Sequence, residues 1–160
     1  MAGRLSTDEL AQMISEGGPF SPGSAVDDEQ IIQLVTGLLR ANAHPDYVTV
    51  MVSESVMRDY PGPEGFGEAW SDWMSPYESF RLEFDEVIQA DDKLVFLVRQ
   101  IAKPRDSAVE FEAPGASVWS LEDGEIRQAA FYLDRSAALK AAGLDPDRPS
   151  SDYYSSASRP

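Results

Sequence analysis

Apolar side chains recur at helical spacing in three stretches of this chain. The clearest stretch runs from 28 to about 43, behind the acidic residues 27–29, and acidic side chains stabilise the start of a helix. A second apolar face, rich in tryptophan, predicts a helix over 64–74. A shorter, capped pattern over 6–14 predicts a third helix. The glycines and prolines of 17–24 then predict a linker.

The second half of the chain changes to the two-residue period of β-strands. Alternation after Phe84 is lost, which predicts a β-bulge that bends that strand. The pair Pro114-Gly115 is expected to interrupt a later strand, and 46–51 fits either a helical turn or a short strand. Strands are predicted over 53–60, 78–90, 93–103, 109–121 and 126–133.

Four long strands followed by one helix predict a strongly bent antiparallel sheet in an α+β fold. A bent sheet encloses a pocket, and we expect the pocket to bind a small hydrophobic molecule. The chain is expected to divide into an N-terminal helix and linker over 1–25, one domain over 26–144, and a disordered tail over 145–160, which lacks apolar periodicity.

Composition limits the partners of the protein. Among 160 residues, 28 are acidic and 13 are basic, which gives a formal net charge of -15. Such a charge repels phosphate backbones and anionic lipids, so neither a nucleic acid nor a membrane partner is expected. The first residues lead into a polar helical pattern, so no secretory signal is expected and a cytoplasmic location is the default.

The sequence offers little for a metal or cofactor site. Cysteine is absent, and the one histidine, His44, lies beside a proline at a helix end. A surface or C-terminal role fits that position better than catalysis. Carboxylates have no recognisable ligand spacing, and no glycine-rich phosphate loop is present. We therefore expect no metal and no cofactor.

Four phrases of the sequence carry a resemblance to a known family. They lie at 59–70, 90–93, 117–126 and 132–135. With the order of predicted elements, they resemble the SnoaL-like branch of the nuclear transport factor 2-like superfamily over 26–144. The resemblance implies a cone-shaped, curved antiparallel sheet (an α+β barrel) covered by N-terminal helices, and a homodimer. Members include isomerases, cyclases, epoxide hydrolases, dehydratases and proteins without known catalysis, so the fold does not settle the function.

Asp59 is the first candidate for a catalytic group. The resemblance implies this role, because the steroid isomerases of the superfamily hold a general base in the matching place before the turn. A carboxylate in an apolar pocket has a raised pKa and can abstract a proton next to a carbonyl. The alternative is that Asp59 caps the turn or the next helix. Those isomerases also use an acidic group on a strand to hold the enolate oxygen. Here that group is missing, since Ser117 stands at the matching position.

Arg99 is the second candidate, because it lies in the middle of the most hydrophobic strand. An unpaired guanidinium is costly there, so it must pair with a ligand or with a carboxylate, and Glu110 or Glu112 on the next strand is suitably placed. An ion pair at a cavity wall can also orient a water molecule, as in the epoxide hydrolases of the superfamily.

Aromatic residues are candidates for the wall of the pocket, although they serve equally well as core residues. We place Phe66, Trp70, Trp73, Phe96 and Trp119 in this class, and Tyr60 and Ser117 as polar neighbours.

The end of the last strand supplies two further candidates. Asp134 fits either an N-cap of the last helix or an acid in the pocket. Tyr132 shares a strand face with Asp134 and Ala130, whereas Phe131 and Leu133 share the other face. If the first set faces inward, the pocket contains the phenol of Tyr132.

Two hypotheses about function follow. The first is a cofactor-independent isomerase, cyclase or hydrolase that acts on a hydrophobic carbonyl compound, with Asp59 as base, Tyr132 or Tyr60 as hydrogen-bond donor, and Arg99 as an orienting charge. The second is a non-catalytic ligand-binding or dimerisation protein of the same fold. An Asp59 carboxylate inside an enclosed cavity would favour the first hypothesis.

Overall fold

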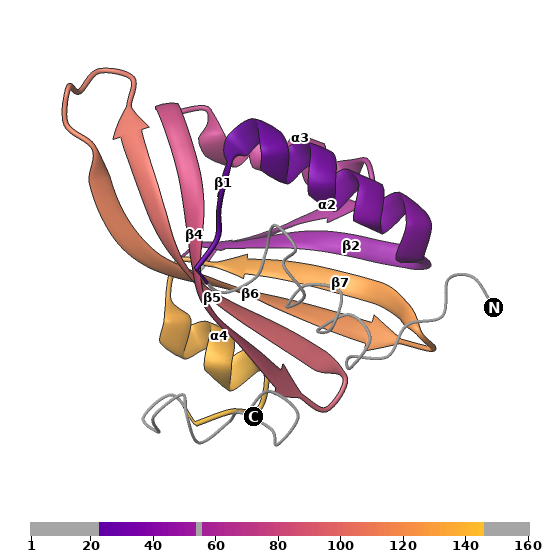
Figure 1. Ribbon diagram of the computed structural model, residues 1–160. Helices are drawn as coiled ribbons and strands as arrows, with labels where there is room; N and C mark the ends of the chain where they lie inside the picture. Colours follow the sequence, from indigo (N-terminus) through magenta and orange to yellow (C-terminus); the bar gives the residue numbers. More distant parts are fainter. Residues whose placement is uncertain (1–22, 54–55, 146–160) are drawn as a thin grey trace.

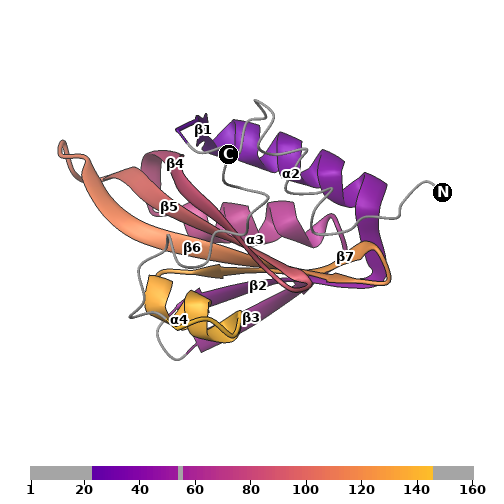
Figure 2. The same ribbon diagram turned by 60° about the horizontal axis from the view of Figure 1, so that its bottom comes forward.

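A curved sheet of seven strands carries the fold, and helices pack on both of its faces (Figures 1 and 2). The structure is a computed structural model that describes residues 23–53 and 56–145. The elements are β1 (Ala25–Asp27), α2 (Asp28–Asn42), β2 (Ala43–Ser53), β3 (Val56–Pro61), α3 (Gly65–Met74), β4 (Tyr77–Ala90), β5 (Lys93–Pro104), β6 (Phe111–Glu122), β7 (Glu125–Tyr132) and α4 (Arg135–Ala141).

The strands lie in the order β1-β4-β5-β6-β7-β2-β3, so the sheet curls but does not close. The predicted α+β class and curved sheet are confirmed. Neighbouring strands are antiparallel, except that β2 runs parallel to β7. Figure 2 shows α2 and α3 on one side of the sheet and α4 on the other. We call these the inner and the outer face.

Helix α2 begins and packs as its sequence predicts. Asp27 is the N-cap, and its carboxylate accepts a hydrogen bond of 2.8 Å from the backbone amide of Gln30, whose side chain accepts one of 3.0 Å from the Asp27 amide. This reciprocal pair satisfies two amides that a helix start leaves without partners. Ile31, Val35 and Leu39, one turn apart, are all buried. The capped end and the apolar stripe together fix α2 against the inner face.

Strand β4 contains the predicted bulge. Its register with β5 shifts between Phe84 and Glu86, so Asp85 is the extra residue. An extra residue bends a strand and increases its local twist. The alternation of β4 therefore changes at the bulge, with Phe84 in the core of the inner face and Ile88 in that of the outer face.

The structure decides one open alternative about the strands and corrects one prediction. Of the helical turn and the strand left open for 46–51, the strand is right, since the segment belongs to β2, which has 11 residues and pairs with β7 and β3 on its two sides. Pro114-Gly115 does not interrupt β6, since Pro114 pairs with Arg99 within the ladder to β5. Pairing with β7 starts only at Ala116. A proline has no amide hydrogen to donate and is therefore tolerated mainly on edge strands. At Pro114, β6 is such an edge, because no described strand pairs with it on the side away from β5.

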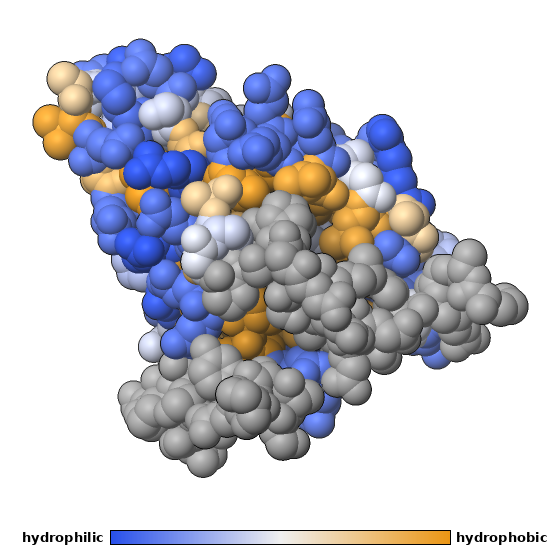
Figure 3. All heavy atoms as spheres, in the orientation of Figure 1, coloured by the Kyte–Doolittle hydropathy of each residue, from blue (hydrophilic) through white to orange (hydrophobic). Residues whose placement is uncertain are grey.

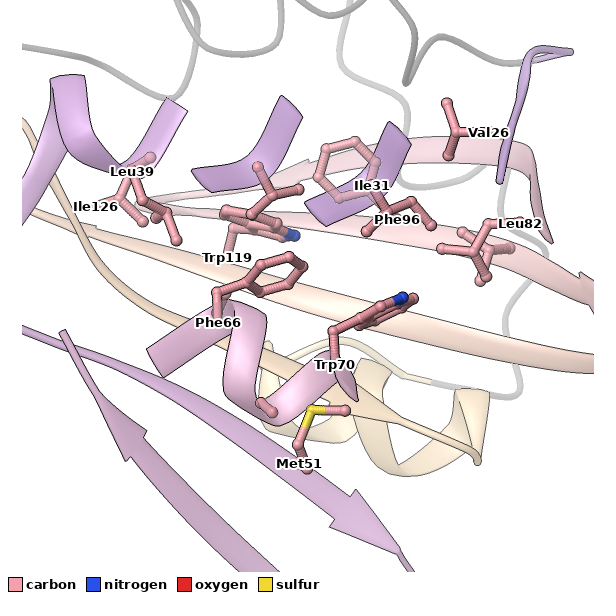
Figure 4. Packing of buried hydrophobic residues seen from close by; sticks show 14 of the residues in the cluster. Val26, Ile31, Leu39, Met51, Phe66, Trp70, Leu82, Phe96, Trp119 and Ile126 are labelled. Carbon is pink, nitrogen blue, oxygen red and sulfur yellow. The ribbon is translucent and has the colours of Figure 1, made fainter. Parts of the chain in front are cut away.

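Two hydrophobic clusters form on the two faces of the sheet. The larger lies on the inner face under α2 and α3, and Figure 4 shows Phe66 and Trp70 extending into it from α3 while Ile31 and Leu39 reach in from α2. The smaller lies on the outer face under α4, where Ala138 and Leu139 pack on strand residues. Because successive strand residues point to opposite faces, each central strand contributes to both clusters.

The predicted helix over 6–14, most of the linker over 17–24, and the tail beyond 145 lie outside the described residues. Within the described residues, none of the helices is long and apolar enough to cross a membrane.

Gly65, at the start of α3, tests how tightly this helix packs. A Cβ atom added there would lie 2.7 Å from the carbonyl oxygen of Tyr60, which is backbone and cannot move aside alone. We expect Gly65→Ala to lower the free energy of unfolding by roughly 1–3 kcal/mol, as overpacking does. Gly37 in α2 has nothing within 4 Å of its added Cβ, so Gly37→Ala should raise stability by about 0.5–1 kcal/mol. Urea unfolding of both variants checks this pair, and equal effects would contradict it.

Candidate functional site

A cavity lies between α2, α3 and the inner face of the sheet. It contains about 730 Å³ of free space, counting the part that opens to solvent. The lining residues Leu38, Trp73 and Gln100 are partly exposed and mark the opening. Figure 3 shows hydrophobic side chains gathered along the lower side of α2, while its upper side is hydrophilic. The lining comprises Ile31, Val35, Leu38, Met51, Trp70, Trp73, Leu82, Phe84, Phe96, Val98, Gln100, Gly115, Ala116, Ser117, Trp119, Phe131 and Tyr132.

Four of the aromatic rings that line the cavity, Trp70, Phe96, Trp119 and Phe131, form one side of this site, and Phe66 packs behind them. Phe131 is central, with ring centroids 5.5 Å from Trp70, 5.7 Å from Phe66 and 6.1 Å from Trp119. Phe96 lies 6.2 Å from Trp119 in an edge-to-face arrangement. Such pairs add roughly 0.5–1.5 kcal/mol each beyond the area that they bury. The aromatic wall is therefore held in place by its own contacts, before any ligand arrives.

Few polar groups face the cavity. The indole nitrogen of Trp119 donates a hydrogen bond of 3.1 Å to Ser117 Oγ, and both residues are buried. At the opening, Gln100 Nε2 donates to the carbonyl oxygen of Pro114 at 3.2 Å. None of the lining residues, all of which belong to the described part of the chain, is an aspartate, glutamate, histidine, lysine or arginine. The cavity is thus aromatic and aliphatic, with a few neutral polar groups.

The family model described as a SnoaL-like domain matches residues 37–129. The chain belongs to the SnoaL-like domain family. This confirms the resemblance stated from the sequence. No curated protein matches the chain.

Solved structures show the same fold at low sequence identity. A hypothetical protein with a ketosteroid isomerase-like fold from Catenulispora acidiphila DSM 44928, in complex with trimethylamine, is 16% identical with a TM-score of 0.52, over 74% of this chain and 86% of that one. Bal32a, from a soil-derived mobile gene cassette, is 12% identical with a TM-score of 0.52, over 69% and 82%. A nuclear transport factor 2-like protein from Burkholderia thailandensis E264 is 15% identical with a TM-score of 0.50, over 74% and 98%. At these identities the likeness concerns the fold alone.

In this SnoaL-like domain, Asp59 is not at the cavity. It is exposed on β3, it pairs in register with Val50 of β2, and it is absent from the lining. The neighbouring Tyr60 is 7% exposed and belongs to the inner core. Because adjacent strand residues point to opposite faces, an inward Tyr60 forces Asp59 outward. The expectation of a carboxylate at the cavity wall in this position was wrong.

Tyr60 does not line the cavity either. Its hydroxyl donates to Asp72 Oδ2 of α3 at 3.1 Å, and its ring packs in the inner core. Burial is the main cause that raises the pKa of Tyr60, and the hydrogen bond to Asp72 adds to it. Tyr60 therefore connects β3 to α3 through this hydrogen bond. Its role is structural, and the expected contact with a ligand is not found.

Tyr132 and Phe131 settle the orientation of β7. Phe131 points inward to the aromatic wall, whereas Tyr132 packs with the outer cluster and only borders the cavity at the end of the strand. Burial raises the pKa of Tyr132. The alternative in which Tyr132 and its neighbours on the same strand face point into the pocket is therefore wrong, and Phe131 is a site residue that the sequence did not single out.

Asp134 is the N-cap of α4. It is exposed, and its Oδ1 accepts a hydrogen bond of 2.9 Å from the amide of Ser136. It does not line the cavity. Of the two alternatives drawn from the sequence, the cap agrees with the structure and the pocket acid does not.

Arg99 lies on the outer face within an ion-pair cluster, away from the cavity lining. Its guanidinium contacts Asp85 Oδ1 at 3.0 Å, Glu83 at 2.9 Å and Glu112 at 3.6 Å. The predicted partner Glu112 is confirmed, whereas Glu110 pairs with Arg81. Arg99 is thus satisfied by carboxylates of this chain, and the structure does not support its expected role as an orienting charge for a substrate.

Asp85 joins two arginines, because its second oxygen contacts Arg135 of α4 at 2.8 Å. Arg135 also donates to the backbone carbonyl oxygens of Val98 and Gly115. Burial by itself would raise the pKa of Asp85, but the hydrogen bonds from Arg135 and Arg99 outweigh it, so the pKa lies below its ordinary value. The bulge residue of β4 therefore fastens α4 to the outer face.

Most of the remaining sequence candidates line the cavity, since Trp70, Trp73, Phe96, Ser117 and Trp119 belong to its wall. Phe66 is the exception, because it is fully buried behind that wall and does not line the cavity. The aliphatic lining residues from α2 and β4 were predicted only as helix and strand core, since nothing in a sequence separates a core side chain from one that borders a cavity.

His44, Glu122 and Asp123 bring possible ligand atoms within 4.8 Å of one another. However, His44 Nδ1 accepts a hydrogen bond of 2.9 Å from the amide of Asp46, so a neutral His44 carries its proton on Nε2. That nitrogen faces Glu122 at 3.4 Å. A protonated nitrogen cannot bind a metal, and this surface group acts as a contact between the start of β2 and the β6–β7 turn.

Asp85 gives the outer face a defined pH dependence. A carboxyl with a lowered pKa in the folded state stabilises the fold above its ordinary pKa, and this contribution is lost as the pH falls through the lowered value. We expect Asp85→Asn to lower the free energy of unfolding at pH 7 by roughly 1–3 kcal/mol, because it leaves two arginines without their shared anion. The variant should also lose less stability than the wild type between about pH 5 and about pH 2.

Urea unfolding at a series of pH values measures this difference. Glu78→Gln is the matched control, because Glu78 also pairs with a cation, Lys103, but at an exposed position of the same strand. Exposed pairs contribute little, so this variant should remain close to the wild type at pH 7. A pH profile of Asp85→Asn parallel to that of the wild type would contradict the role given to Asp85.

Proposed function

We propose that this SnoaL-like domain binds a small, uncharged and largely apolar molecule in the cavity between α2, α3 and the inner face. The observation that carries the proposal is the wall itself, in which Trp70, Trp119, Phe96 and Phe131 surround free space and no ionisable acid or base of the lining is charged at neutral pH. Ligand pockets are commonly apolar with a few placed polar groups.

An acid/base isomerase or cyclase is the alternative, and the positions of the carboxylates argue against it. A general base must come within about 3 Å of the proton that it removes. Asp59 and Asp134 are exposed outside the lining, and Asp85 is held between two arginines on the outer face. Binding without proton transfer by a carboxylate therefore fits the cavity better than catalysis.

The proposal can be tested by blocking the cavity. Leu38 lines it near the opening, whereas Leu34, one turn earlier in α2, is exposed and does not line it. We expect the wild type to bind the neutral fluorescent probe N-phenyl-1-naphthylamine, and Leu38→Trp to weaken binding at least about tenfold because the larger side chain occupies the space.

Leu34→Trp is the matched control, because it adds the same indole on the same helix outside the cavity. Its affinity for the probe should equal that of the wild type, and so should that of Asp59→Asn. Titration followed by fluorescence, with circular dichroism to verify folding, provides the measurement. If the folded wild type does not bind the probe, or if Leu34→Trp weakens binding as much as Leu38→Trp, the proposal fails.

We also propose that the domain forms a homodimer through the part of the outer face of its sheet that α4 leaves uncovered. The charges on that face support this, since Arg99, Asp85 and Glu83 are paired with one another. Burial of already paired charges leaves no single charge without a partner. Light scattering during gel filtration should give twice the mass of one chain, and the mass of one chain would contradict the proposal.

A further inference from the structure

The indole nitrogen of Trp70 differs from the other buried polar atoms of the site. Trp70 is 3% exposed, and its Nε1 is buried without a hydrogen-bond partner among the residues that the structure describes. A buried donor that lacks a partner costs about 1–3 kcal/mol. Native proteins rarely retain such a group unless something else satisfies it.

The position of Trp70 indicates where the missing hydrogen-bond acceptor would come from. Trp70 lines the cavity, and in Figure 4 its indole extends from α3 toward the sheet, with the nitrogen at the end nearest to Leu82. Leu82 is itself a lining residue. By contrast, the nitrogen of Trp119 is already bonded to Ser117 Oγ. Of these two buried indoles in the wall, only that of Trp70 still has its donor available.

The rest of the wall limits which acceptor can enter. No carboxylate or cationic side chain belongs to the described lining, so a charge on the ligand would be buried without compensation. The net charge of -15 repels anions. A cation would suit the aromatic faces, but it offers no lone pair to an N–H group whose hydrogen is itself positive. A neutral acceptor oxygen meets all these conditions.

We propose that Trp70 Nε1 donates a hydrogen bond to the bound molecule and selects uncharged ligands that carry an acceptor oxygen, such as a carbonyl, an ester or an ether. This rests on the proposed binding function and adds to it the polar group that the ligand must have. Trp70 is thus a specificity-determining residue, and the aromatic wall supplies the contacts that any apolar ligand shares.

Three probes of one shape separate the possibilities. They are 1-indanone, which carries a neutral acceptor, indane, which carries none, and 1-aminoindane, which is a cation at pH 7. We expect the wild type to bind 1-indanone about tenfold more tightly than indane, the range that one buried neutral hydrogen bond supports. It should bind 1-aminoindane most weakly. Calorimetric titration measures all three affinities.

Trp70→Phe removes the donor but keeps an aromatic ring, and it should reduce the preference for 1-indanone over indane to less than twofold. Leu34→Phe is the control, since Leu34 is exposed on α2 outside the cavity lining and the variant also places a phenylalanine on a helix that borders the cavity. It should keep the preference. A Trp70→Phe variant that retains the tenfold preference would overturn the inference.

A second measurement needs no folded Trp70→Phe variant. The chain has three tryptophans, so its amide spectrum contains three indole N–H resonances. The Trp70 resonance should move downfield with 1-indanone and not with indane. If both probes bind and this resonance moves equally with each, or if 1-aminoindane binds most tightly, the role of Trp70 is wrong while the proposed cavity stands. If none of the three probes binds, both proposals fail.

Discussion

The pleat of the central strands governs this molecule, because it forces successive side chains to serve two different environments. Along β5, Phe96 and Val98 face the cavity, while Val95 and Leu97 pack in the outer cluster under α4. A shift of one residue in register would exchange these sets. The same strands therefore supply both the cavity wall and the surface on which α4 packs, so a change of register would alter both.

The bulge at Asp85 shows how the fold uses a local break in that alternation. Phe84 remains in the inner core, while Asp85 reaches Arg99 and Arg135 on the outer face. The same extra residue that bends β4 also supplies the anion that holds α4. One position of the sequence thus contributes both to the bend of the sheet and to the attachment of the last helix.

The sequence predicted the elements better than the site, for a physical reason. Helix periods, caps and breaks in alternation are local, and so α2, α3 and the bulge of β4 follow from neighbours in the chain. A two-residue period shows which strand residues share a face, but not which face lies inside. For this reason the face of β7 that carries Tyr132 stayed open and Phe131 was not singled out, whereas Asp59 was suggested by the family resemblance and lies on the face that points away from the cavity. The sequence offered Glu110 or Glu112 of the next strand as the partner of Arg99, and Glu112 is the one in contact. The contact of Arg99 with Asp85 depends on the bulge, and that of Asp85 with Arg135 depends on the docking of α4.

Pro114 has a consequence for how this sheet meets other chains. The outer stretch of β6, up to Gly115, lies beyond the pairing with β7, so among the described strands only β5 pairs with it. Exposed edges invite a strand from another molecule to add to the sheet, which leads to aggregation. Pro114 has no amide hydrogen to offer, so the ladder that an incoming strand would need is broken there. Pro114 thus removes one donor from this stretch of β6, and proline is a residue that natural sheets place on edge strands.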